Sequence, residues 1–121
     1  MIVSEAIEKV KERKPNAYSD QIMLDWLNEC EAQVQRDLMD TMPEGIFSYS
    51  IDDDMERELL LPRPYDSAYL FYIQAMIEFS QQEYSAYNNT IALYNNLISE
   101  AAKYYNRKYQ KTERVKIHNY L

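Results

Sequence analysis

The chain has 121 residues and a mass of 14.5 kDa, which suits one domain and excludes two independent hydrophobic cores. It contains a single glycine, which excludes the glycine-rich loops that cradle phosphate groups, so no nucleotide-binding fold is expected. The net charge of −7 is divided unevenly, because residues 1–102 carry 7 bases against 19 acids and residues 103–121 carry 6 bases and 1 acid. Since DNA affinity depends on Lys and Arg displacing counterions, only the C-terminal segment can attract DNA.

Two helices are predicted before residue 43. The first is indicated by apolar residues at helical spacing, namely Val3, Ile7 and Val10. Ser4 is its expected cap and Pro15 its expected stop. Ser19 is the expected N-cap of the second helix, which should end before Pro43. The apolar stripe of this second helix is formed by Met23, Leu27, Cys30, Val34 and Leu38.

Residues 43–64 lose the helical periodicity and are predicted to form a long connection. One alternative is a solvated, irregular loop, and the other is a hairpin in which residues 46–51 pair with residues 58–61. Loops of this length are usually functional, so the segment is a candidate for contact with another molecule. The acidic run Asp52–Asp54 lacks the alternating ligands and the central glycine of a calcium loop, so no metal site is expected.

A long helical hairpin is predicted after Pro64. The third helix begins near Tyr65 or Asp66 and is apolar on nearly all sides from residue 68 to residue 79. Its own domain, with or without a neighbouring copy, must therefore cover it on two sides. A break at residues 80–83 leads to a fourth helix, which is expected to pack antiparallel on the third. The packing seam of the fourth helix is formed by Tyr87, Ile91, Tyr94, Ile98, Ala101 and Tyr105.

These elements predict an all-α fold. We expect a small bundle of about four helices, with a long hairpin of helices three and four and a long irregular or hairpin-like loop between helices two and three. The helical domain spans residues 1–107 and includes the loop at residues 43–64. Residues 108–121 lose the apolar stripe and are basic, so a flexible or partner-docked tail is expected there. The apolar part of the third helix is too short to cross a membrane.

No catalytic constellation is recognisable in the sequence, so the chain is not expected to be an enzyme and no catalytic residue, cofactor or metal ligand is assigned. The single histidine, His118, lies in the tail, where no rigid support would hold it for catalysis. Cys30 lies on the predicted buried stripe and is expected to be a core residue. The acidic residues Glu5, Glu8 and Glu12 do not fit a signal peptide, so synthesis in the cytoplasm is expected.

Tyrosine is the most distinctive residue of the chain. There are twelve tyrosines, and nine of them lie between Tyr65 and Tyr109. One interpretation is that they pack in the core. The other is that they form a subunit interface, where tyrosine is enriched because it joins an apolar ring to a polar hydroxyl. Both interpretations stay open at the level of sequence.

Several short runs between Ser4 and Arg107 form a recognisable pattern. They are Lys14-Pro15-Asn16, Ser19-Asp20, Trp26-Leu27, Leu60-Leu61-Pro62-Arg63-Pro64-Tyr65-Asp66 followed by Tyr69, Tyr87-Asn88-Asn89, Tyr94-Asn95 and Tyr104-Tyr105-Asn106-Arg107. In these runs the chain resembles small head-tail connector, or adaptor, proteins of tailed bacteriophages and prophages. The resemblance covers most of residues 4–107, and it does not extend to the tail after Lys108.

The resemblance implies a structural subunit of a closed, dodecamer-like ring at the neck of the virion, made in the cytoplasm of a bacterial host. The implied partners are other copies of the chain, the portal protein and a downstream tail or stopper protein. DNA would pass through the ring without sequence-specific binding, and no membrane is involved. The candidate contacts with other subunits or with the portal are Tyr69, Tyr72, Tyr87, Tyr94, Lys108, Lys111, Arg114 and Lys116.

The sequence also allows an alternative function. The chain would then be a small helical interaction module, regulatory or chaperone-like, that binds one partner through the apolar third helix. A DNA-binding helix-turn-helix is disfavoured, because the second helix would bring several acids to the major groove.

Overall fold

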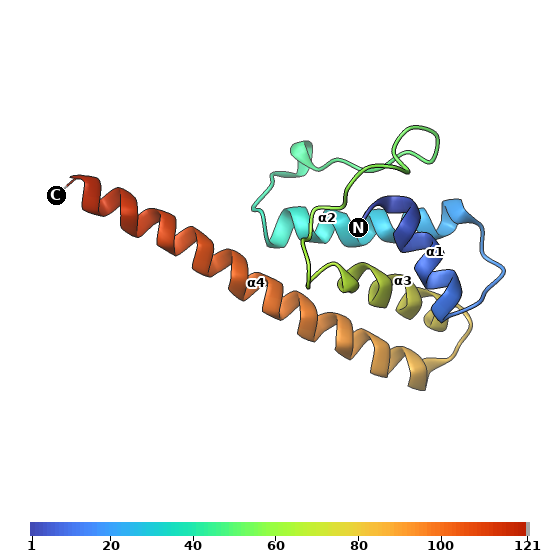
Figure 1. The fold of residues 1–121 in the computed structure, drawn as a ribbon. Helices are drawn as coiled ribbons and strands as arrows, with labels where there is room; N and C mark the ends of the chain where they lie inside the picture. Colours follow the sequence, from blue (N-terminus) through green and yellow to red (C-terminus); the bar gives the residue numbers. More distant parts are fainter. Residues whose placement is uncertain (121) are drawn as a thin grey trace.

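The computed structural model describes the backbone of residues 1–120 and the side chains of residues 1–108. Within this range the protein consists of the α-helices α1 (Val3–Arg13), α2 (Asp20–Asp37), α3 (Ser67–Ser80) and α4 (Tyr84–Tyr120), with a short 3-10 helix, η1 (Pro43–Gly45) (Figure 1). The predicted all-α fold is confirmed, as is the long connection between α2 and α3. The connection does not form the alternative hairpin, because the β-bridge found in the described residues joins Glu58 to Ile2.

The start of α1 differs from the prediction. The helix is preceded by Ile2, and no side chain caps it, so Ser4 is not the cap. Its first amides are instead satisfied by the loop, since Val3 N–H donates to the carbonyl of Arg57 (3.0 Å) and Ser4 N–H donates to the carbonyl of Met55 (2.9 Å). The first turn of a helix always has amide groups without an intrahelical partner, and here a distant backbone segment supplies their acceptors.

Helix α2 begins as the sequence predicts. Its N-cap is Ser19, whose side-chain oxygen accepts a hydrogen bond from the N–H of Ile22 (3.2 Å). The helix ends at Asp37, several residues before Pro43. Asp40 has a positive φ of 53°, a conformation that ends a helix, and Thr41 N–H then donates to the carbonyl of Gln35 (2.9 Å).

Helix α3 is the central element, with α1 and α2 on one side and α4 on the other (Figure 1). Its buried apolar residues are Ala68, Tyr69, Leu70, Tyr72, Ile73, Ala75 and Ile77. The covering expected on two sides is thus supplied by the chain itself. At its C-terminal end, Lys14 binds Glu83 (2.7 Å) and lies 3.9 Å from the buried Glu78, which ties the end of α1 to the turn between α3 and α4.

Helix α4 packs on α3 through the predicted seam. Tyr94 and Ala101 are buried, and Ile91, Ile98 and Tyr105 are half-buried. The helix does not end near Arg107 but continues to Tyr120, past the end of the other helices (Figure 1). An apolar stripe indicates only the part of a helix that packs against other elements. Beyond it the helix can continue without a packing face, because Lys, Gln, Glu and Arg are good helix formers.

Candidate interaction surfaces

A buried carboxylate lies at the centre of the molecule. Glu31 on α2 is fully buried and accepts hydrogen bonds from the hydroxyls of Tyr69 (2.6 Å) and Tyr49 (2.7 Å) and from the N–H of Leu60 (3.1 Å). Burying a carboxylate costs free energy unless hydrogen bonds replace its hydration, and here three donors do so. Burial and the negative charge of Glu31 raise the pKa of Tyr69 and of Tyr49, so both hydroxyls remain protonated donors.

Two amide side chains on the same side of α2 hold the long loop. Asn28 donates to the carbonyl of Tyr49 (3.0 Å) and accepts from the N–H of the same residue (2.8 Å). Gln35 makes the corresponding pair of bonds with Phe47 (3.0 and 3.1 Å). Asn28, Glu31 and Gln35 are three and four residues apart, so they share one side of the helix. The loop is therefore attached to α2 by side chains.

This polar set was not predicted from the sequence. The pattern that could have revealed it is the spacing of Asn28, Glu31 and Gln35, which continues the stripe formed by Leu27 and Val34. Polar residues at such positions are usually solvated, and only the tertiary partners from the loop and α3 explain their burial.

A second network joins α2 to α3 and α4. The hydroxyl of Tyr72 donates to Glu29 (3.0 Å), and the hydroxyl of Tyr94 donates to Gln33 (3.1 Å). The two tyrosine rings lie 5.2 Å apart, and burial raises the pKa of both hydroxyls. Cys30 is buried beside them, as predicted for a core residue, and burial raises the pKa of its thiol. The two tyrosines and the cysteine are buried and hold helices together, whereas Glu29 is exposed at the edge of the network.

The tyrosines predicted as contacts are mostly core residues. Tyr69 is fully buried, Tyr72 is 7% exposed and Tyr94 is 5% exposed, all within a single chain. Tyr69 has no surface to offer a second subunit, and Tyr72 and Tyr94 have very little, so these three residues are mainly core residues and not the subunit or portal contacts that the sequence suggested. Tyr87 is half-buried on α4, where its ring lies 5.3 Å from that of Phe79.

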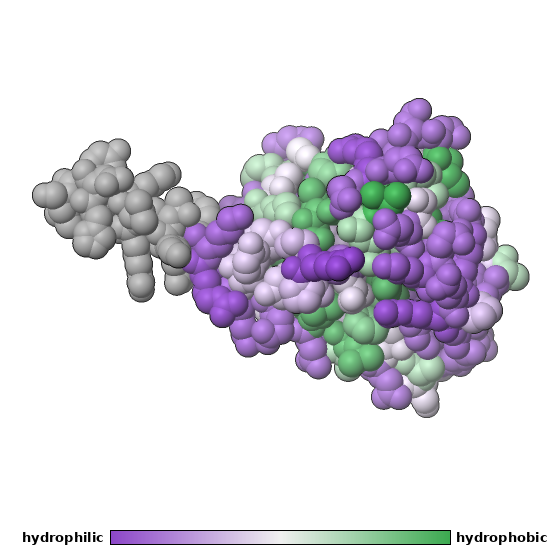
Figure 2. Space-filling view, viewed as in Figure 1, coloured by the Kyte–Doolittle hydropathy of each residue, from purple (hydrophilic) through white to green (hydrophobic). Residues whose placement is uncertain are grey.

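The corner between α3 and α4 exposes aromatic rings. Phe79 and Tyr84 are each 52% exposed, and their rings lie 5.7 Å apart. Leu93, further along α4, is 50% exposed. Figure 2 shows apolar residues reaching the visible face of the body in separate patches among polar ones. The corner is thus one local patch on a mixed surface.

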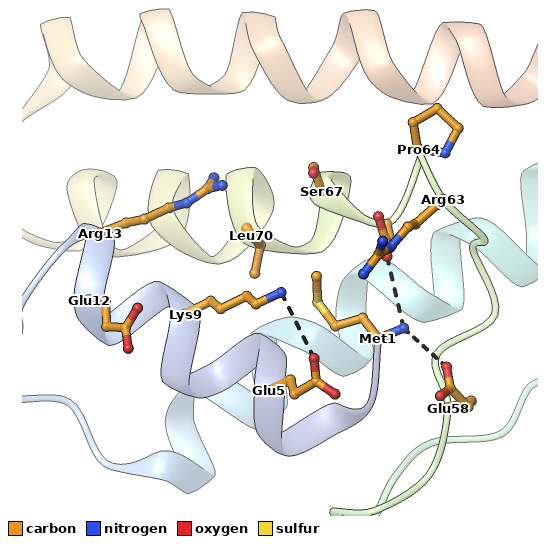
Figure 3. A pocket seen from close by; sticks show the side chains of 11 residues that line it. Met1, Glu5, Lys9, Glu12, Arg13, Glu58, Arg63, Pro64, Ser67 and Leu70 are labelled. Carbon is orange, nitrogen blue, oxygen red and sulfur yellow. Dashed lines mark hydrogen bonds and ion pairs between the residues drawn. The ribbon is translucent and has the colours of Figure 1, made fainter.

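A polar pocket of about 700 Å³ lies between α1, the start of α3 and the end of the loop (Figure 3). Charges of both signs line it and pair across it. The Met1 amine donates to Glu58 (3.1 Å) and lies 3.9 Å from Asp66, and Lys9 lies 3.9 Å from Glu5. Because the charges compensate one another, the pocket does not select a cation or an anion by its field.

An open notch lies between the C-terminal end of α2 and the middle of α4. It comprises two adjoining hollows of about 690 and 200 Å³, which share Asp37 and Leu38. The larger is lined by Asp37, Leu38, Met39, Asp40, Tyr105, Asn106 and Lys108, and the smaller also by Gln33, Val34, Tyr94, Asn95 and Ile98. Apolar, polar and charged side chains, including the base Lys108, line the notch together.

The predicted basic contacts lie at the outer end of α4. Lys108 is exposed and lines the notch. The side chains of Lys111, Arg114 and Lys116, and His118 with them, lie outside the described part of the chain. Arg36 binds Asp37 at the edge of the notch through two hydrogen bonds (2.7 and 3.0 Å), and this contact lowers the pKa of Asp37.

Two further features concern ligands and membranes. Among residues 1–108, no three His, Cys, Asp or Glu side chains are grouped so that they could hold a metal ion. In the acidic run of the loop, Asp54 accepts from the N–H of Ser50 (2.7 Å) and pairs with Arg57 (3.5 Å), which stabilises a turn. No helix in the described range is both long and apolar enough to cross a membrane.

Comparison with protein-family models, with curated proteins and with solved structures finds no match to this chain.

Proposed function

We propose that the chain is a structural assembly protein of a virus particle, a head-tail connector that forms a ring beneath the portal and joins the head to the tail around the DNA channel. The observation that carries this proposal is the uneven distribution of charge along the chain. An acidic body, with 7 bases against 19 acids in residues 1–102, continues into the last part of helix α4, residues 103–120, which carries 6 bases against 1 acid and projects beyond the body (Figure 1).

Both parts suit such an assembly. A body with this excess of acids repels the phosphate backbone, so DNA would pass it without being held. A projecting helix of opposite charge provides a second surface that differs from the body, as a head-to-tail contact between copies requires. The expected partners are therefore further copies of the chain, the portal protein and a downstream tail or stopper protein, in the neck of the virion.

The runs that carry the resemblance to connector proteins have structural roles here. Leu61 N–H donates to the hydroxyl of Tyr69 (2.9 Å), which in turn binds Glu31, and Leu27 is fully buried. Ser19 caps α2. These residues of the pattern contribute to the fold, whereas Pro62, Arg63, Pro64, Asn88, Asn89, Asn95, Asn106 and Arg107 of the same runs are exposed.

The alternative, an interaction module that binds a partner through the apolar third helix, has little of that helix available. Most apolar residues of α3 are buried within the same chain, and Phe79 at its C-terminal end is 52% exposed. Such a module would bind through this exposed end or through another surface.

The proposed function is tested by mixing the full-length protein with the portal ring encoded in the same genome. Sedimentation followed by negative-stain imaging should show a collar of density on one end of the portal. A mixture in which the protein stays monomeric and the portal unchanged would contradict the proposal.

A further inference from the structure

The bases of α4 are gathered in its last part. Residues 64–102 contain no Lys or Arg, and six bases follow from residue 103 onward, with one acid among them. Four of the six are spaced four, four and three residues apart, so at about 100° per residue they lie within about 80° of one another on one side of the helix. This basic stripe consists of Lys103, Arg107, Lys111 and Arg114.

The basic stripe faces away from the body. The fully buried Ala101 lies two residues before Lys103, so the two side chains leave the helix about 200° apart. The side chain of Lys103 is 66% exposed, and its ion pair with Glu100 (3.4 Å) is at the surface, where such pairs contribute little. Arg107 is exposed as well. The first two bases of the stripe are therefore open to a molecule that approaches α4 from outside, and the helical register continues the stripe along the same side.

The outer end of the stripe extends away from the acids of the body. Helix α4 runs straight on to Tyr120, past the other helices (Figure 1). At 1.5 Å per residue, Arg114 lies about 9 Å further along the axis than Lys108, which lines the notch on the body. The Debye length at physiological ionic strength is about 8 Å, so the repulsion between the body and an anion bound at this end is largely screened.

A line of bases on one side of a projecting helix fits a polyanion with regularly spaced charges. The stripe carries its four bases over about 16 Å of helix. Each strand of duplex DNA places one phosphate every 3.4 Å or so along its axis, for a total of about five over the same length. An anionic membrane fits less well, because a helix that lies on a membrane needs an apolar side opposite its bases. Here the register places Thr112 and Lys116 opposite the stripe.

The acidic body of another copy also fits less well than DNA. Several of its acids already have a base of their own chain, since Lys11 binds both Glu8 (3.2 Å) and Asp20 (2.6 Å), and Arg36 binds Asp37 (2.7 Å). The stripe would have to compete with these ion pairs. The phosphates of DNA hold only mobile counterions, and the release of those counterions favours binding.

We propose that the basic stripe of α4 binds the phosphate backbone of duplex DNA without reading its sequence. Contacts of Lys and Arg with phosphates position a protein on DNA but carry no sequence information. The inference goes beyond the proposed function, which requires only that DNA pass the body. The outer part of α4 then gives each copy of the chain one salt-sensitive contact with the DNA that its body repels.

The test is the binding of a fluorescent duplex DNA of random sequence to the full-length protein, measured by anisotropy from about 50 to about 200 mM salt. Four phosphate contacts predict that the logarithm of the association constant falls with the logarithm of the salt concentration with a slope of about −3.6. The association constant should therefore fall roughly 150-fold over this range. A duplex of unrelated sequence should compete equally well.

Variants of the stripe are compared with variants of the body. Lys111→Glu with Arg114→Glu removes half of the stripe, so it should weaken binding roughly tenfold or more and bring the slope to about −1.8. Lys111→Arg with Arg114→Lys keeps the charge and should bind like the wild type. Lys9→Glu with Arg63→Glu makes the same change of net charge on exposed bases of the body and should weaken binding far less. Circular dichroism checks that each variant is folded.

The inference is overturned if the wild type does not bind DNA, if the stripe variant binds like the wild type, or if the body variant loses as much affinity as the stripe variant. Stripe-dependent binding to phosphatidylserine vesicles or to a second copy of the chain, without binding of DNA, overturns it too and identifies the occupant. None of these measurements contains the portal. The collar of density on the portal therefore remains a separate test of the proposed function.

Discussion

The body of the molecule and the outer part of α4 use polar residues in opposite ways. In the body, Asn28, Glu31 and Gln35 on α2 have their hydrogen-bonding groups satisfied by the loop and by α3. The outer part of α4, residues 108–120, follows the last residue of the packing seam, Tyr105, and carries four bases and one acid. Internal satisfaction fixes a fold, whereas charge left at the surface is available to a partner. Stability and association should therefore respond to different substitutions.

The largest expected effect is alkaline unfolding of the body. Burial raises the pKa of Tyr49, Tyr69, Tyr72 and Tyr94 above their ordinary value of 10.0. The neutral hydroxyls stabilise the fold fully below pH 10, and this stability is lost as the pH rises above it, because the unfolded chain then releases protons more readily. Circular dichroism and tyrosinate absorbance should change together. Tyrosines that ionise while the helices persist would contradict the buried networks.

Next in size is the substitution Glu31→Ala. It leaves the hydroxyls of Tyr49 and Tyr69 and the N–H of Leu60 without their acceptor in the interior. We expect the free energy of unfolding in urea to fall by about 3 kcal/mol. Glu29→Ala, which removes an exposed acceptor of the Tyr72 hydroxyl, is the matched control and should cost less. Equal losses for the two variants would show that Glu31 has no central role.

A smaller effect is expected at the start of α2. Ser19→Ala removes the hydrogen bond to the N–H of Ile22 and should lower the free energy of unfolding by about 1 kcal/mol. Ser4→Ala serves as the comparison, because the loop backbone satisfies the start of α1. If Ser4→Ala costs as much as Ser19→Ala, the assignment of the two helix starts is wrong.

The smallest effect on stability is expected in the outer part of α4. Lys111→Glu with Arg114→Glu should change the free energy of unfolding by less than about 0.5 kcal/mol, since surface substitutions away from packed contacts rarely do more. Urea unfolding at a concentration where the wild type is monomeric measures it. A large loss would show that this segment supports the body, and the contrast between the two regions would fail.

Much of the fold was predictable because helices leave periodic patterns in sequence. The cap at Ser19, the break at residues 80–83 and the seam of α4 are all local features. The cap at Ser4 was predicted wrongly, since the acceptors for the first turn of α1 come from residues more than fifty positions away. The prediction that Tyr69, Tyr72 and Tyr94 form contacts between subunits fails for a related reason. Every tyrosine has both an apolar ring and a polar hydroxyl, so the sequence does not show whether it lies in the core or at the surface. Tyr69 and Tyr94 lie in the core, where Glu31 and Gln33, respectively, accept hydrogen bonds from their hydroxyls.

The attachment of α1 to the loop has a consequence for the dynamics of the protein. Because the amides of Val3 and Ser4 donate to the carbonyls of Arg57 and Met55, the first turn of α1 and this part of the loop stabilise each other. The two segments should therefore open together as one cooperative unit in native-state hydrogen exchange. Protection of the Val3 and Ser4 amides would then report whether Met55 and Arg57 of the loop, more than fifty residues further along the chain, are in place.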